Sequence, residues 1–157
     1  MIMKWTLTSI LLVGYTLPFV ECTVPPFLHG ARASTIDDFN RLLAAADKLT
    51  DKQLQAEVDT WIALQDTHVK DAYKDFAEQQ KEAKELVESA HQAAVANMSP
   101  SAQDADERMA SIANDPTLTG EQKRSRIQSI FDELEPTVKH QLANAALAGR
   151  WMVAKWK

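Results

Sequence analysis

Apolar residues recur along most of this chain at intervals of three and four positions, which is the spacing of one face of an α-helix. The longest such run predicts a helix from about Asp66 to Asn97, with a heptad seam along one side and charged residues on the other. The seam consists of Val69, Tyr73, Phe76, Gln80, Ala83, Val87, Ala90 and Ala94. Its second half is rich in alanine, which buries little area and allows close approach. A partner helix of the same chain is therefore favoured over a coiled-coil dimer, and we expect a monomer.

Two shorter helices are predicted before the long one. The first begins at Ser34 or Thr35, with Asp37 and Asp38 in its first turn, where the positive end of the helix dipole favours anions. The second follows the sequence Thr-Asp-Lys-Gln at residues 50–53. This is a capping box, in which the threonine and glutamine side chains each satisfy a backbone N–H group at the start of the helix.

Three further helices are predicted after the long one. Ser99-Pro100 is a cap followed by proline at the first helical position, and Thr119-Gly120-Glu121-Gln122 is a second capping box. Glu135-Pro136 ends one helix and begins the next, because the residue before a proline is disfavoured in helical angles. No segment after residue 22 alternates apolar and polar residues as a strand does. The predicted fold is an all-α bundle of about six helices.

Residues 1–22 have the features of a secretory signal peptide. Lys4 lies near the start of a short apolar core, and Val20 and Cys22 fit the small-residue positions of a cleavage site. The apolar core is too short to span a membrane and contains Pro18, which disfavours a membrane anchor. Cleavage after Cys22 removes the only cysteine, so the secreted chain would be held together by core burial without a disulfide.

The remaining chain divides into an extended entry arm at residues 23–33, a helical domain at 34–146 and a basic aromatic tail at 147–157. We expect Phe27 and Leu28 of the arm to pack onto the helices, with Gly30 allowing the turn that follows. Trp151 and Trp156 in the tail either pack back onto the bundle or rest at a lipid interface among their basic neighbours.

The charge of the chain makes nucleic acid an unsuitable partner. The formal net charge is −5, and nucleic-acid affinity depends largely on neutralising phosphates with basic residues. Lys123, Arg124 and Arg126 form the densest basic cluster, and we interpret them as a solvated helix face.

Few patterns in the sequence suit catalysis. No glycine belongs to a phosphate-binding loop or a nucleophile elbow, and the four histidines lack the spacing of zinc proteases. His68, Asp71 and Asp75 would follow one edge of the long helix as possible metal ligands, but such a row on a charged helix is typical of ordinary surface. We therefore expect a protein that is not an enzyme.

One loop suggests divalent-cation binding. Asp115, Thr117, Thr119 and Glu121 fall at positions 1, 3, 5 and 7 of an EF-hand-like register and are the candidate ligands for calcium or magnesium. Position 12, where a glutamate is required, is Arg126. A helix end, a proline-led turn and a capping box explain the same residues without metal, and this interpretation is favoured. Carboxylates from another helix, such as Asp47 or Asp51, could complete a site.

A possible modification site lies directly before the fourth predicted helix start. Asn97-Met98-Ser99 is an N-glycosylation sequon. Pro100 follows it and Ser99 is needed as a helix cap, so we expect Asn97 to carry little or no glycan.

Two blocks of sequence resemble the SXP/RAL family of secreted nematode proteins, which includes immunodominant antigens and fish-parasite allergens. The matching residues are Pro25-Pro26-Phe27-Leu28, Gly30-Ala31, Met98-Ser99-Pro100, Ala102-Gln103, Ala105-Asp106-Glu107, Ile112-Ala113, Asp115-Pro116, Leu118-Thr119-Gly120, Gln122-Lys123, Ile127-Gln128 and Ile130. The resemblance covers nearly everything after residue 24. It implies a secreted, all-α, non-enzymatic protein with a cation-binding type of domain, and it does not define a biochemical role.

Two functional hypotheses follow. The first is a secreted, non-catalytic interaction protein exposed to host immunity, with an unknown extracellular or host partner and a weak divalent-cation site. The alternative is an extracellular carrier of small apolar ligands, such as a fatty acid, inside the bundle. A carrier needs a cavity lined by large apolar side chains, whereas the alanine-rich seam favours close helix contact.

Overall fold

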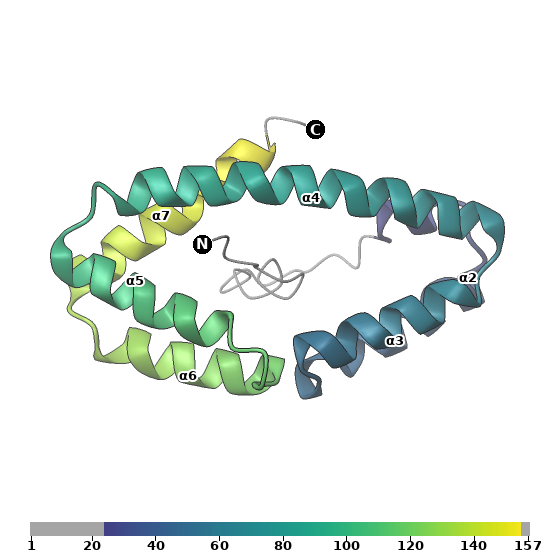
Figure 1. Ribbon diagram of the computed structural model, residues 1–157, viewed down its shortest axis with the longest axis horizontal. Coiled ribbons are helices and arrows are strands. Elements are labelled where there is room, and N and C mark those ends of the chain that lie inside the picture. Colours follow the sequence, from purple (N-terminus) through teal and green to yellow (C-terminus); the bar gives the residue numbers. More distant parts are fainter. Residues whose placement is uncertain (1–23, 155–157) are drawn as a thin grey trace. The chain divides into compact units, whose positions relative to one another are not determined.

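The computed structural model describes residues 24–154, with side chains described for residues 24–146. This part of the chain forms six α-helices and two short 3-10 helices, with an isolated β-bridge and no strand (Figure 1). In chain order the elements are η1 (Pro26–Leu28), α2 (Ala33–Ala44), η2 (Ala46–Lys48), α3 (Asp51–Ala63), α4 (Thr67–Val95), α5 (Pro100–Ala113), α6 (Gly120–Glu133) and α7 (Pro136–Ala154). The predicted all-α class and the six helices are confirmed. The signal sequence at residues 1–22 lies outside the described part.

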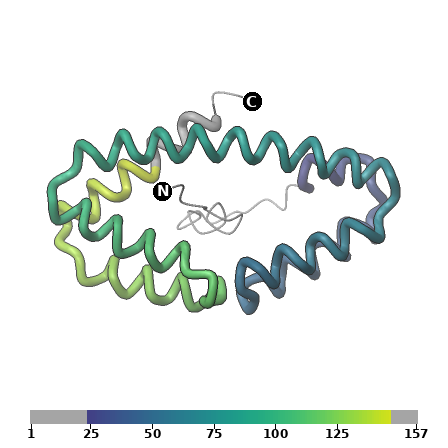
Figure 2. The backbone as a smooth tube through the Cα atoms, in the orientation of Figure 1, coloured from purple at the N-terminus to yellow at the C-terminus, as the bar shows by residue number. Residues whose placement is uncertain are grey.

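The chain divides into two compact units. Unit 1 contains the residues up to Gln79 together with Pro116–Gln122, and unit 2 contains Gln80–Asp115 together with the residues from Lys123 onward. The long helix α4 therefore contributes its first part to unit 1 and its second part to unit 2. Figure 2 shows the helix as one uninterrupted tube.

Local sequence signals account for most helix starts. The Thr50 hydroxyl accepts a hydrogen bond from the Gln53 backbone at 3.3 Å, and the Gln53 side chain accepts one from the Thr50 backbone at 2.9 Å, which is the predicted capping box of α3. Ser99 caps α5 and accepts a hydrogen bond from the Ala102 backbone. These side chains satisfy backbone donors that a helix start would otherwise leave unpaired.

Helix α2 starts earlier than its sequence predicts. It begins at Ala33, with Arg32 at the cap position and no side-chain cap, so Asp37 and Asp38 lie beyond the first turn. The expected stabilisation of that turn by anions is therefore wrong.

The core of unit 1 is built around the entry arm. Phe27 and Leu28 are 3% and 0% exposed, and they pack with Phe39 of α2 and Val69 of α4, as predicted for the arm. Gly30 follows with a φ of +82°, a left-handed conformation that favours glycine, and the chain turns there into α2. The arm is therefore part of the core.

The core of unit 2 lies between α5 and α7. Ala102 and Ala105 of α5 are buried against Val138 and Leu142 of α7, and small side chains on α5 let the two helices approach closely. The backbone N–H of Ser99, at the start of α5, donates to the side-chain oxygen of Gln141 on α7 at 2.8 Å.

The predicted seam of α4 is confirmed along the whole helix. Val69 is buried and every other seam position is half-buried. The positions predicted for solvent are all exposed, namely Lys70, Asp71, Lys74, Glu78, Lys81, Glu82 and Glu85. Within residues 24–154, no helix combines the length and apolar content needed to cross a membrane.

Candidate functional site

Two loops of unit 1 share the sequence Leu-Thr-x-x-Gln, at Leu49–Gln53 and at Leu118–Gln122. They lie side by side: Thr50 and Thr119 form an antiparallel β-bridge, and the Gly120 N–H donates to the Leu49 carbonyl at 3.2 Å. We call these segments the paired loops. The repeated five-residue pattern is the sequence signal that could have predicted their pairing. Each copy contains a capping box and leads into the start of a helix.

The second capping box forms as predicted and fixes where α6 begins. The Thr119 N–H donates to the Gln122 side chain at 3.0 Å, and the Gln122 N–H donates to the Thr119 hydroxyl at 3.3 Å. Because α6 starts at Gly120, the twelve-residue loop of an EF-hand does not form, and Arg126 lies within the helix. Positions 6 to 12 of the EF-hand-like register are therefore helical residues of α6.

The candidate metal ligands fall in both units. Thr117 is exposed, Thr119 is half-buried and Glu121 lies exposed in the first turn of α6, all in unit 1. Asp115 is half-buried directly after α5, in unit 2, where its backbone N–H donates to the Ile112 carbonyl.

Asp47, in the short helix η2, lies against Gly120 in the second of the paired loops. A methyl group added at Gly120 would lie 3.3 Å from the Asp47 Cα and 3.4 Å from the Asp47 Oδ1, so the carboxylate lies against the start of α6. Glycine at position 120 makes this approach possible. Asp51, the other carboxylate considered from sequence, is buried in the first turn of α3.

The residues present define which metals fit. No group of three or more His, Cys, Asp or Glu side chains gathers in the described part of the chain, and His68, Asp71 and Asp75 are each exposed on α4. Carboxylate, hydroxyl and amide oxygens remain as donors, which calcium and magnesium prefer. A site made from few carboxylates would hold either ion weakly.

The prediction that the basic cluster of α6 forms a solvated face is wrong for Lys123. Its side chain is fully buried, Arg124 is half-buried and only Arg126 is exposed. In the repeated pattern, Lys123 stands one position after Gln122 just as Leu54 stands after Gln53, and Leu54 is a core residue. Comparing the two copies would have predicted the burial.

The Asn97 sequon is placed on the surface at the end of α4. Asn97 is exposed, and its Nδ2 donates to the Ala93 carbonyl at 2.8 Å. Ser99 serves as the cap of α5, so both sequon residues already have structural partners.

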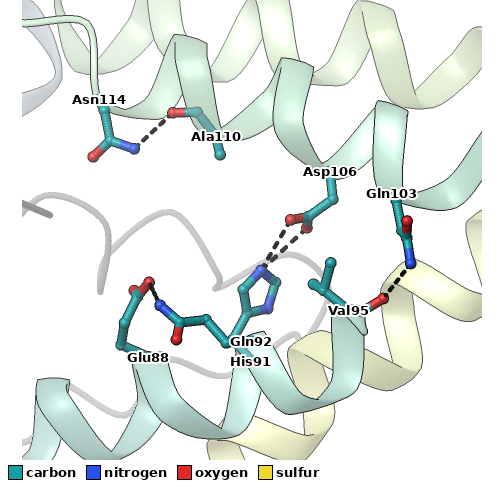
Figure 3. Close-up of polar contacts among 8 residues, drawn as sticks. All are labelled: Glu88, His91, Gln92, Val95, Gln103, Asp106, Ala110 and Asn114. Atoms are coloured by element: carbon teal, nitrogen blue, oxygen red, sulfur yellow. Dashed lines mark hydrogen bonds and ion pairs between the residues drawn. The ribbon is translucent and has the colours of Figure 1, made fainter. Parts of the chain in front are cut away.

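A second polar cluster joins α4 to α5 within unit 2. Figure 3 shows the His91 ring directed at the Asp106 carboxylate, with Nε2 at 3.1 and 3.2 Å from the two oxygens. The hydrogen bond to Asp106 raises the pKa of His91 above its usual 6.5, burial opposes this, and the charges of Asp106 and Glu88 add to the rise. The attraction between the His91 ring and the Asp106 carboxylate is therefore strongest when His91 is protonated.

This contact predicts a pH-dependent stability. Because the pKa of His91 is raised by folding, the contribution is fully present below about pH 6.5, the usual value, and is lost as pH rises through the folded pKa. Asp106→Asn should lower the free energy of unfolding by about 1 kcal/mol at about pH 5.5 and by less at about pH 8.5. Urea unfolding at both pH values measures the difference. His140→Gln, on an exposed histidine, is the control, and an Asp106→Asn effect that is independent of pH would contradict the assignment.

Comparison with known proteins gives consistent matches. Residues 1–147 match the family model described as SXP/RAL-2 family protein Ani s 5-like, metal-binding domain. The chain is 42% identical over 125 residues to the OV-17 antigen of Onchocerca volvulus, covering 80% of this chain and 76% of that protein. It is 34% identical over 118 residues to the SXP/RAL-2 family protein Ani s 5 of Anisakis simplex, covering 75% and 78%. No solved structure matches the chain.

Proposed function

The chain belongs to the SXP/RAL-2 family, and from that premise we propose that it is a secreted, non-catalytic, host-exposed protein that binds a divalent cation weakly. The description of the family model as a metal-binding domain supports the cation. A relative named as an antigen supports exposure to a host. The partner in this setting is an unidentified extracellular or host component.

Secretion is supported by the N-terminal signal sequence and leads to a first test. Expressed in a eukaryotic secretory host, the released product should begin at Thr23 and lack cysteine. Asn97 should stay largely unmodified, because its Nδ2, the atom that would carry the glycan, donates to the Ala93 carbonyl. Intact mass before and after glycosidase treatment measures both. A product that retains residues 1–22 would contradict the signal peptide. A fully glycosylated product would contradict the expectation for Asn97.

The observation that carries the cation proposal is the approach of Asp47 to the paired loops. It places a carboxylate beside Gly120, whose chain neighbours Thr119 and Glu121 are candidate ligands in the same unit, as is Thr117. Asp115 is a separate candidate ligand in unit 2. Extracellular calcium modules with fuller ligand sets reach dissociation constants of about 10⁻⁴ to 10⁻³ M, so we propose an affinity weaker than about a millimolar.

Unfolding with added cation tests this proposal. About 10 mM calcium or magnesium chloride should raise the free energy of unfolding of the mature protein by at most about 1.4 kcal/mol relative to sodium chloride of equal ionic strength. Asp47→Asn should reduce the gain, whereas Asp37→Asn, on an exposed residue of α2, should not. An equal gain in sodium chloride would contradict cation binding. Sub-micromolar affinity that is lost on Asp115→Ala would contradict a weak site.

The described cores give no support to the alternative of an apolar-ligand carrier. In unit 1 the ring of Phe27 contacts those of Phe39 and Tyr73, and in unit 2 Ala102 and Ala105 are 0% and 1% exposed between α5 and α7. Both arrangements are typical of closely packed helices.

A further inference from the structure

Two methionines flank the buried face of α5. Met98 comes directly before the cap of this helix, Met109 lies in its second half, and both pack against the core of unit 2. Ala102 and Ala105 stand between them, so that the four residues follow one another at intervals of three or four positions. The face that α5 turns toward α7 therefore has two alanines at its centre and a methionine on either side.

The two methionine side chains combine contact with the core and access to solvent. Ala102 and Ala105 are 0% and 1% exposed, whereas Met98 and Met109 are each half-buried. A small solute in water therefore reaches part of each methionine, while the rest of the side chain packs against apolar neighbours. Exposure makes a methionine susceptible to oxidation, and packing makes the oxidation costly to the fold.

The backbone around Met98 is fixed by hydrogen bonds. Its N–H donates to the Val95 carbonyl at 3.0 Å, and its carbonyl accepts from the Gln103 Nε2 at 3.2 Å. The same Nε2 donates to the Val95 carbonyl at 3.1 Å, as Figure 3 shows. The N–H of the next residue, Ser99, donates to the Gln141 side chain on α7. Because these bonds hold the connection between α4 and α5, a change in the Met98 side chain acts on the packing of α5.

We propose that Met98 and Met109 form an oxidation site through which peroxide loosens the packing of α5 against α7. The sulfur lone pair of each thioether attacks one peroxide oxygen, the O–O bond breaks, and the products are a methionine sulfoxide and water. The sulfur loses two electrons and the peroxide gains them. The cysteine of the chain, Cys22, lies in the predicted signal peptide, so no thiol competes with these thioethers in the described residues.

The effect on the fold follows from the polarity of the product. A sulfoxide oxygen is a hydrogen-bond acceptor, whereas the neighbours of both methionines in the core of unit 2 are apolar side chains. An acceptor pressed against apolar groups loses its hydrogen bonds to water and gains none in return. The oxidised side chains must therefore either remain in place at this cost or leave the core.

Treatment of the mature protein with hydrogen peroxide tests the proposal. Peptide mapping by mass spectrometry should find an added oxygen on Met98 and on Met109, formed within about tenfold of the rate in urea-unfolded protein. A side chain exposed only by global unfolding would instead be protected about a thousandfold or more. In urea denaturation the oxidised protein should show an unfolding equilibrium constant about tenfold larger, and methionine sulfoxide reductases should restore the native value.

The double variant Met98→Leu and Met109→Leu is the matched control. Leucine is apolar and close to methionine in volume, so the variant should fold and should be as stable after peroxide as before. Other oxidisable side chains remain in it, and a loss that it shares with the native protein would arise from them. Each single variant should keep part of the loss.

Three results would overturn the inference. The first is protection of both thioethers by about a thousandfold in the folded protein. The second is sulfoxide formation at Met98 and Met109 that leaves the unfolding equilibrium unchanged, and the third is an equal loss in the double variant. A loss that one single variant abolishes completely would overturn the role of the other methionine.

Discussion

Replacing Phe27 by alanine should lower the free energy of unfolding by about 3–5 kcal/mol, the range for deleting a buried aromatic side chain. Phe27 is 3% exposed, and its ring centroid lies 5.3 Å from that of Phe39 and 5.2 Å from those of Tyr73 and Phe76. The residue thus connects the entry arm to both α2 and α4. A domain is typically stable by about 5–15 kcal/mol, so the loss would be a large fraction of the total stability.

Urea denaturation followed by circular dichroism measures this effect. Leu64→Ala is the matched control, because Leu64 is 80% exposed and its truncation should change stability by no more than about 0.5 kcal/mol. Equal midpoints for Phe27→Ala and the native protein would show that the arm contributes nothing to the core of unit 1. The expected loss would mean that a fragment beginning at α2 is a poor substitute for the mature chain.

The helices could be predicted from sequence because their signals are local. The Thr50 and Ser99 caps and the proline at position 136 lie within a few residues of the helix starts they determine. The start of α2 was misplaced because a cap-type residue, Ser34, follows the true start and Arg32 makes no side-chain cap. At α2, where no side chain caps the helix, the predicted start was one or two residues too late.

The candidate site could be predicted only in part, because it depends on contacts between distant residues. The sequence located the Asp115–Glu121 loop and named Asp47 as a carboxylate that could join it. The pairing of Thr50 with Thr119 requires the chain to return across about 70 positions, and the repeated Leu-Thr-x-x-Gln pattern is the sequence feature that indicates it.

Lys123 leads to the second large prediction, which is that Lys123→Met will lower the free energy of unfolding by about 3 kcal/mol. The side chain is fully buried directly after the second of the paired loops, at the position that corresponds to Leu54 after the first. Its ammonium is not among the buried groups that lack a partner in the described part, and the residue takes part in at least one polar or ring interaction. Methionine keeps much of the volume but leaves that partner unsatisfied.

Two effects of opposite sign compete in this substitution, and their magnitudes decide the result. Removing a buried charge avoids its desolvation penalty, which favours the variant. Leaving the partner of that charge buried and unpaired generally costs more, about 3–5 kcal/mol where a buried ion pair is broken from one side. Arg126→Met is the control, since it removes an exposed cation from the next turn of α6 and should change stability by no more than about 0.5 kcal/mol. Urea unfolding of both variants compares the two positions. A Lys123→Met protein as stable as the native one would mean that the ammonium contributes no net stability and that the position is an ordinary apolar core site, as it is at Leu54.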